Sequence, residues 1–204
     1  VDALNRDLIA LFRGETVRTP VFDFRAGAPS TRDCVVAKLP PRGVVVMEGI
    51  HCLNDRLTPL VPAQQKVKIF VAPMSPLNVD EGHHVANDTT RLIRRIVRDH
   101  RSRGYSALDT LGRWASVRRG EDLHIFPFMD AADIVYNTAL SYEINVLRPF
   151  CEPLLASVKP GTTHYQLAKQ LECFMAQFVS AQADDIPSMS LLREFVGGSF
   201  YHTG

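Results

Sequence analysis

Apolar residues recur along this 204-residue chain at two periods, and each period predicts a different kind of element. Near the start, positions 4, 8, 11 and 12 mark one face of a helix that ends at Gly14, because glycine commonly follows a helix. Two strands are predicted next, over residues 16–24 and 35–39, on either side of a Gly-, Pro- and Ser-rich segment. We interpret residues 16–39 as a β-hairpin.

Later strands are shorter and more apolar. The β-branched runs at 44–47 and 67–72 are typical of strands that are buried on both faces, and residues 132–137 form a further strand. Helices are predicted over 88–104, 106–119, 141–155 and 164–179. Asp88 is the expected N-cap of the first of these helices. Strands that alternate with helices indicate a parallel sheet with crossover helices, and therefore an α/β fold.

Composition excludes several classes of protein. Hydrophobic residues make up 46% of the chain, which is enough for a sizeable core, and the net charge is only +1. No apolar run reaches the roughly 18 residues of a membrane span. The four cysteines lack C-x-x-C spacing, which suits a reducing compartment. We expect a cytoplasmic protein with no membrane segment. The sequence gives no direct evidence for a nucleic-acid partner, and it leaves a homo-oligomer open.

The positive charge is concentrated in residues 88–104, which contain six arginines against Asp88 and Asp99. On a helix, Arg91, Arg95 and Arg98 share one face, and positions 94, 98 and 101 share the face beside it. Apolar residues at 92, 93, 96 and 97 fill the opposite side. Like charges at these spacings repel, so with few local acids the helix is expected to bind an anion such as a phosphorylated ligand. A solvated basic face is the alternative.

Three motifs in order give the chain a family resemblance. Residues 91–104 resemble the R-L-x-R-R-x-x-R-D-x-x-x-R-G lid of the uridine kinase and phosphoribulokinase family of P-loop kinases. Upstream, PVFDF at 20–24 resembles the P-x-Y-D-F substrate hairpin, and VVVMEGIH at 44–51 resembles a strand that ends in E-G-I. Residues 104–155 and SLLREFVGG at 190–198 are similar to a long branch whose members carry upstream TGS and threonyl-tRNA-synthetase-like modules.

The resemblance implies an α/β P-loop kinase fold, with a parallel sheet flanked by helices. Its expected parts are a substrate hairpin at 16–39, an Arg-rich helical lid at 88–120 and a C-terminal helical extension at 160–204, all in one domain. The implied activity is ATP- and Mg²⁺-dependent phosphotransfer to a hydroxyl of a small molecule, such as the nucleosides uridine or cytidine. The alternative is a non-catalytic or regulatory module that binds a phosphorylated ligand.

One family motif does not occur in this sequence. No G-x-x-x-x-G-K-[ST] loop, whose backbone amides wrap phosphates, is present. In the family, that loop and the aspartate that acts as catalytic base both precede the segment that matches Val1. We therefore expect these residues to be the C-terminal part of a longer kinase domain, inactive by themselves.

The expected site residues follow the motifs. Glu48 comes after an apolar strand, at the edge where open α/β sheets bind ligands, and its carboxylate suits Mg²⁺. The alternative for Glu48 is an ion pair with a lid arginine. By motif position, Arg95, Arg98 and Arg103 match the family's catalytic arginines, and Arg91 and Arg94 are expected to contact the nucleotide.

The substrate residues are expected to be Phe22, Asp23 and Phe24. Phe22 stands where the family has a tyrosine, so it can stack on a base but offers no hydroxyl. Gly27 stands about where uridine kinases carry a histidine that binds the pyrimidine. Loss of a hydrogen-bonding group weakens discrimination between substrates, so uridine specificity does not follow from the resemblance.

Overall fold

A computed structural model describes residues 1–23, 28–74, 77, 81 and 85–201, and the chain divides into two compact units. The first unit comprises Val1–Phe70 and Asp122–Ile134, and the second comprises Val71–Glu121 and Val135–Gly204.

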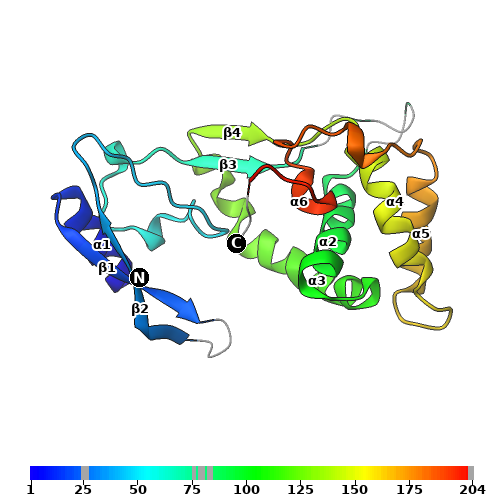
Figure 1. Cartoon of the computed structure of the whole chain (residues 1–204), viewed down its shortest axis with the longest axis horizontal. Coiled ribbons are helices and arrows are strands. Elements are labelled where there is room, and N and C mark those ends of the chain that lie inside the picture. The colour runs from blue at the N-terminus through cyan, green and yellow to red at the C-terminus, as the bar shows by residue number, and fades with distance from the viewer. Residues whose placement is uncertain (24–27, 75–76, 78–80, 82–84, 202–204) are drawn as a thin grey trace. The chain divides into compact units, whose positions relative to one another are not determined.

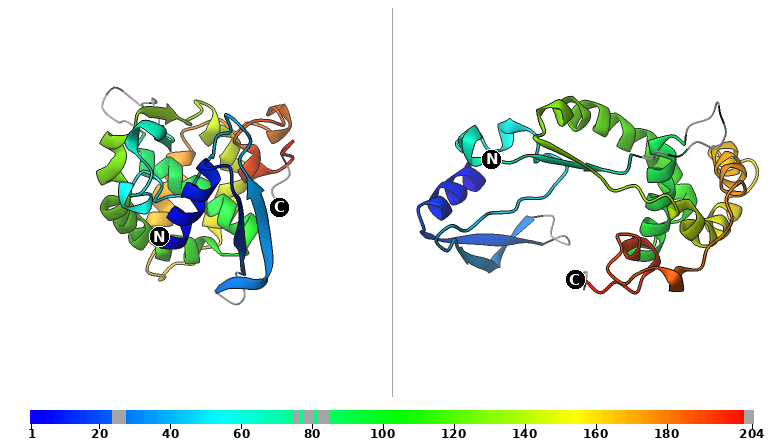
Figure 2. Two further views of the ribbon diagram at one scale, coloured as in Figure 1. Left: turned by 90° about the vertical axis from the view of Figure 1, so that its left-hand side faces the viewer. Right: turned by 90° about the horizontal axis from the view of Figure 1, so that it is seen from above.

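The first unit begins with a helix and a β-hairpin, as predicted. Helix α1 spans Asp2–Phe12, and Gly14 follows it with a positive φ of +76°. Strands β1, Thr16–Asp23, and β2, Ala28–Lys38, pair antiparallel from Thr16 opposite Lys38 to Asp23 opposite Ala28 (Figure 2). Strand β2 starts well before the predicted Val35, because pairing with β1 extends it across the Ser-containing segment.

Asn5 of α1 holds the loop that follows β2 against this helix. Its buried side chain donates hydrogen bonds to the carbonyls of Val1 (3.0 Å) and Leu57 (2.9 Å), and its oxygen accepts one from the Leu60 amide (3.3 Å). The loop contains two short 3₁₀ helices, η1 over Asp55–Leu57 and η2 over Ala63–Gln65. A buried amide that satisfies three backbone groups compensates for the small number of buried apolar side chains in this unit.

The strand predicted at 44–47 does not form. Val44 and Val46 are 82% and 88% exposed, and no segment in the described part of the chain pairs with them. An extended segment becomes a strand only when a neighbour satisfies its backbone groups. The prediction of burial on both faces is also wrong for the next strand, β3 (Ile69–Ala72), since Ile69 and Val71 are 51% and 58% exposed.

Strand β3 pairs with β4, Ile134–Asn137, and the pairing is parallel. The Lys68 carbonyl accepts a hydrogen bond from the Ile134 amide (3.1 Å), and the Ala72 carbonyl accepts one from the Thr138 amide (2.9 Å). Both strands therefore advance in the same direction. Among the described residues, two α-helices and one 3₁₀ helix lie between β3 and β4 in the sequence, which confirms the predicted parallel sheet and the α/β class.

The helices that follow β3 in the described part of the chain are α2 (Asn87–Arg103), α3 (Ala107–His124), η3 (Phe126–Ala131), α4 (Glu143–Ala156), α5 (Tyr165–Met175), η4 (Ala183–Asp185) and α6 (Arg193–Val196). In the second unit, α4 packs against α2 on one side and α5 on the other, and α6 contacts α2 and α4 (Figure 1). No helix among the described residues is both long and apolar enough to span a membrane.

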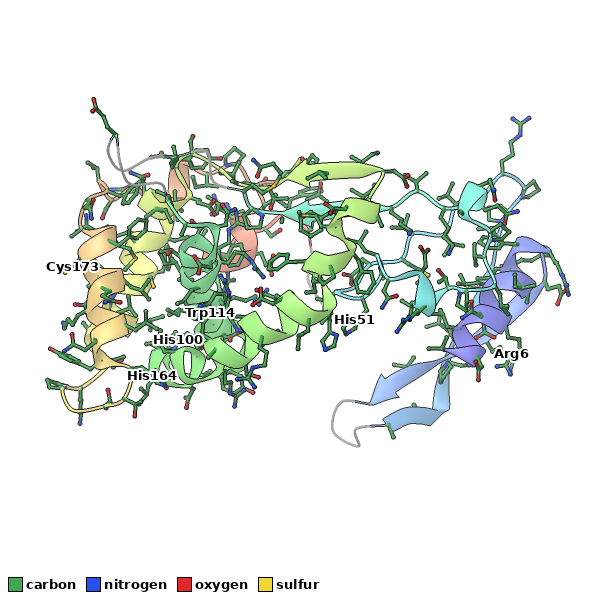
Figure 3. All side chains as sticks on the ribbon, turned by 180° about the vertical axis from the view of Figure 1, so that it is seen from behind. Arg6, His51, His100, Trp114, His164 and Cys173 are labelled. Atoms are coloured by element: carbon green, nitrogen blue, oxygen red, sulfur yellow. The ribbon has the colours of Figure 1, made fainter. Side chains whose placement is uncertain are left out.

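The hydrophobic core cluster lies entirely within the second unit. It contains the predicted apolar face of α2, of which Ile93 is fully buried, together with residues of α4, α5 and α6 such as Leu147, Met175 and Phe195. Trp114 of α3 is partly buried against this cluster (Figure 3). The arginine-rich helix is therefore held in the second unit by its apolar face.

The ends of α2 and α3 are set by local chemistry. Gly104, in the left-handed conformation at φ +67°, ends α2 as predicted. The Ser106 amide donates to the Asp109 carboxylate (3.0 Å) and the Asp109 amide donates to the Ser106 hydroxyl (3.1 Å), which is a reciprocal cap. The Ser106 hydroxyl also donates to the Asp109 carboxylate (2.6 Å), and this hydrogen bond, followed by the one from the Ser106 amide, lowers the pKa of Asp109. The N-cap prediction for Asp88 is wrong: Ala86 occupies that position, and Asp88 lies in the first turn.

Candidate functional site

Three arginines of α2 converge on one buried carboxylate. Asp99 is 1% exposed, with Arg95 Nε 3.2 Å from its Oδ2 atom and Arg103 Nη1 2.8 Å from its Oδ1 atom. Arg98 Nε lies 3.9 Å from the same Oδ1 atom. Arg95 and Arg103 stand one helical turn before and after Asp99, so both side chains can reach it, whereas Arg98 is its neighbour in the sequence and lies farther from the carboxylate. We call Asp99 and these three arginines the Asp99 cluster.

The Asp99 cluster carries more positive than negative charge. Three guanidinium groups surround one carboxylate, and the side chains of Arg95, Arg98 and Arg103 remain 24%, 32% and 47% exposed. The Nε atoms of Arg95 and Arg98 are buried without a well-formed hydrogen bond to any described residue. Because three guanidinium groups share one carboxylate and remain partly exposed, the excess positive charge favours an added anion at the exposed side of the cluster.

Arg91 has an internal partner on α3. Its Nη1 atom donates a hydrogen bond of 2.8 Å to Oε2 of Glu121, and Nη2 contacts the other oxygen of the same carboxylate. Glu121 is only 5% exposed. This paired, two-point contact is the geometry in which guanidinium binds carboxylate most strongly, so Arg91 holds α2 and α3 together.

Arg94 is used internally as well. Its Nε atom donates to the Glu143 carboxylate of α4, and Nη2 donates to the Thr138 carbonyl at 3.0 Å. Only 12% of the Arg94 side chain is exposed. The expectation that the arginines of α2 have few internal partners is therefore wrong, because Glu121 and Glu143 lie far along the sequence and the fold brings them close.

The remaining charges of α2 pair near the surface. Arg118 of α3 reaches Asp88 at 2.6 Å, and this pair is 37% and 40% exposed. Arg98 Nη1 lies 3.5 Å from Oε1 of Glu194 in α6, and Arg101 donates a long hydrogen bond of 3.5 Å to the Arg193 carbonyl. Because its two carboxylate contacts are 3.5 and 3.9 Å long, Arg98 is the most weakly paired arginine of the Asp99 cluster.

Glu48 belongs to the first unit. It is exposed and ends the segment that begins at Val44. Its predicted place at the end of a buried strand is wrong, because this segment has no pairing partner among the described residues and forms no strand. Burial, and secondarily the Glu48 charge, raise the pKa of the nearby Cys52 thiol. No group of three or more His, Cys, Asp or Glu side chains gathers among the described residues as a ready metal site. A single exposed carboxylate does fit Mg²⁺, which keeps most of its water ligands.

Two of the three substrate residues proposed from the sequence lie at the end of β1 in the first unit. Phe22 and Asp23 are the last residues of β1, opposite Pro29 and Ala28. Phe24 lies outside the described residues.

Sequence reasoning missed the carboxylates that organise the arginines. Asp99 could have been found, since acids at i+4 from Arg95 and i−4 from Arg103 are a recognisable helix signal. Glu121, Glu143 and Glu194 lie 30, 49 and 96 residues beyond their partners in the sequence, so no local pattern identifies them.

Part of this sequence is similar to known proteins. Residues 1–144 match the phosphoribulokinase / uridine kinase family. A uridine kinase of Ligilactobacillus salivarius (strain UCC118) is 30% identical over 135 residues, which cover 66% of this chain and 54% of that protein. A uridine kinase of Staphylococcus aureus (strain JH9) is 29% identical over 135 residues, or 66% of this chain and 56% of that protein. The chain thus spans about half the length of the curated relatives it matches. With the motifs, the α/β fold and this match, the chain belongs to the phosphoribulokinase / uridine kinase family of P-loop kinases.

Proposed function

We propose that the chain is the C-terminal part of a kinase domain that transfers the γ-phosphate of ATP to a hydroxyl of a small molecule, with a nucleoside such as uridine or cytidine as the acceptor. The observation that carries the proposal is the excess positive charge of the Asp99 cluster. Family membership supports it, and relatives named as kinases do not favour the non-catalytic alternative. A cytoplasmic location belongs to the same proposal.

The arginines divide into two roles in this proposal. Phosphoryl transfer spreads negative charge over the oxygens of the transferred group, and guanidinium groups stabilise that charge. Arg95, Arg98 and Arg103 are assigned this role because part of each side chain is exposed. Arg91 and Arg94 are assigned to fixing α2, because Glu121 and Glu143 already use their guanidinium groups.

The first unit is assigned the metal and the acceptor. Glu48 would hold Mg²⁺ directly or through water, and the bound ion would neutralise charge on the ATP phosphates. The aromatic rings of Phe22 and Phe24 would stack on the acceptor, and Asp23 would accept a hydrogen bond from one of its hydroxyls. The 204 residues contain no P-loop sequence, so we expect no transfer from this chain alone.

The test uses a natural protein that contains these residues together with a G-x-x-x-x-G-K-[ST] loop. ADP formation from ATP is measured with and without Mg²⁺, and with each of a panel of nucleosides. We expect acceptor- and Mg²⁺-dependent turnover, and a loss of about 10²-fold in kcat for Arg98→Ala. Arg6→Ala is the control, because Arg6 is an exposed residue of α1 whose ion pair is with its sequence neighbour Asp7 (Figure 3).

One result would contradict the proposed kinase activity, and a second would contradict only the role assigned to the Asp99 cluster. Turnover that no nucleoside or other hydroxyl compound stimulates would exclude a small-molecule kinase. Full activity in Arg95→Ala and Arg98→Ala would remove the Asp99 cluster from the mechanism while leaving the kinase assignment in place.

A further inference from the structure

Helix α6 lies against a second arginine face of α2 (Figure 1). The ring of Phe195 lies 5.5 Å from the Arg94 guanidinium, and the Arg193 carbonyl accepts the hydrogen bond from Arg101. Between these two contacts, Glu194 faces Arg98. Helix α6 follows residue 144, where the family match ends, so nothing in that match assigns it a role.

The backbone of α6 is firmly anchored. Phe195 and the preceding Leu192 are 5% and 0% exposed in the core cluster. Gly197 follows α6 at φ +92° and is packed so closely that an added Cβ would lie 2.7 Å from a guanidinium nitrogen of Arg101. The Arg193 guanidinium also donates to the Gly197 carbonyl at 3.1 Å. The segment therefore stays docked even when a single exposed side chain in it moves.

Glu194 is such a side chain. It is 53% exposed, and its 3.5 Å distance to Arg98 is longer than that of a strong charged hydrogen bond. Arg98 gains little from Asp99, which is 3.9 Å away, whereas Arg103 lies 2.8 Å from the same carboxylate. Arg98 is thus held between two carboxylates at the outer limit of an ion pair, and its Nε atom has no hydrogen bond to any described residue.

We propose that Glu194 sets the affinity of the Asp99 cluster for phosphate, by neutralising Arg98 until a polyphosphate displaces its carboxylate. The identity of the anion rests on the proposed function. An exposed ion pair contributes little free energy, whereas a polyphosphate offers several charges and two-point contacts to guanidinium. The Glu194 side chain can turn toward solvent while α6 remains in place. Because every anion must displace it, Glu194 favours polyphosphates over singly charged anions.

The test is a calorimetric titration of the 204-residue chain with inorganic tripolyphosphate at low ionic strength, where exposed charges are little screened. We expect Glu194→Gln to bind about two- to five-fold more tightly than the unaltered chain, which corresponds to loss of an exposed ion pair. The two proteins should have the same circular dichroism spectrum. In an Arg98→Ala background, Glu194→Gln should no longer change the affinity, because the pair it disrupts is gone.

Glu152→Gln is the matched control. Glu152 lies on α4 in the same unit, its side chain is 37% exposed, and it pairs with Arg148 at 2.9 Å. The substitution removes the same charge from the unit, so it should leave the affinity unchanged. A gain as large as that of Glu194→Gln would show a general charge effect and overturn the inference.

Other outcomes separate the inference from the proposed function. If Arg95→Ala and Arg98→Ala weaken binding while Glu194→Gln does not strengthen it, the anion site stands and the role of Glu194 is overturned. If tripolyphosphate does not bind, or binds both arginine variants as tightly as the unaltered chain, the anion site itself is wrong and the role of Glu194 is overturned with it.

Discussion

Arg94 and Glu143 form an ion pair inside the second unit, with side chains that are 12% and 2% exposed. The pair connects α2 to the first residue of α4, and its remaining polar atoms are also used. The second carboxylate oxygen of Glu143 accepts a hydrogen bond from the Leu140 amide (3.2 Å), while Arg94 donates to the Thr138 carbonyl. Two charges removed from water are tolerated here because each is satisfied.

Removing one member of this pair should therefore destabilise the chain strongly. Arg94→Ala leaves the Glu143 carboxylate buried without its cation, and we expect a loss of about 3–5 kcal/mol in the free energy of unfolding, measured with urea. Arg118→Ala is the comparison, because its pair with Asp88 is more exposed and should cost less than about 1 kcal/mol. Equal losses in the two variants would contradict a structural role for Arg94.

Asp99→Asn should make the second unit depend on added anions. The substitution leaves three guanidinium groups without their shared carboxylate, and we expect it to cost about 3 kcal/mol. Tripolyphosphate should then raise the Tm of Asp99→Asn by more than it raises that of the unaltered chain, because the ligand supplies the missing negative charge. Asp88→Asn, which removes an acid from the first turn of α2, should not show this difference.

The four thiols should differ in reactivity. Burial, and then the neighbouring Glu152 charge, raise the pKa of Cys151 to about 12. At pH 8 its reactive thiolate is therefore scarce, whereas Cys34 is exposed, as is Cys173, which Figure 3 labels. A colorimetric disulfide reagent should label Cys34 and Cys173 first, Cys52 more slowly, and Cys151 only after unfolding. Rapid labelling of Cys151 in the folded chain would show that the core of the second unit opens.

The Asp55 carboxylate should make the stability of the first unit depend on pH. Hydrogen bonds from Lys68, and then from Lys66, lower the pKa of Asp55 below its ordinary 3.8. The folded state thus favours the carboxylate, so the stabilisation is present above that pH and is lost as the pH falls through the lower folded-state pKa. The Tm difference between the chain and Asp55→Asn should be small at neutral pH and should vanish in stronger acid. A difference that grows toward low pH would have the wrong sign.

Glu48→Gln should separate catalysis from stability. Because Glu48 is exposed, the change should alter the unfolding free energy of this chain by no more than about 0.5 kcal/mol. In a protein that also contains a P-loop, the same change should lower kcat by orders of magnitude if Glu48 holds Mg²⁺. Glu15→Gln, another exposed acid of the first unit, should preserve activity. An undiminished rate in Glu48→Gln would exclude the metal role.

Local signals predicted the helical part of the fold well. The spacing of apolar residues in 92–97 identified the buried face of α2, and Gly14 identified the end of α1. Ser106 and Asp109 identified the start of α3, because a reciprocal cap needs only residues three positions apart. These features depend on contacts within one helix or one turn.

Long-range features were not predictable in the same way. The valines at 44–47 have a strand-like sequence, but a strand also requires a partner, and a propensity does not supply one. The arginines of α2 were expected to have few internal partners, because Glu121, Glu143 and Glu194 become neighbours only after the helices pack. Sequence reasoning thus identified the cations of the candidate site and missed most of its anions.

The core cluster has a consequence for how such a chain can be inherited. The family match ends at residue 144, which is the second residue of α4. Ile93 and Ile96 precede that boundary, and the core residues Cys151 and Met175 that belong to the same cluster follow it. A gene truncated or recombined there would divide α4 and expose the apolar face of the arginine-rich helix. The end of the family match is therefore not a boundary of folding, because residues on either side of it pack into one core.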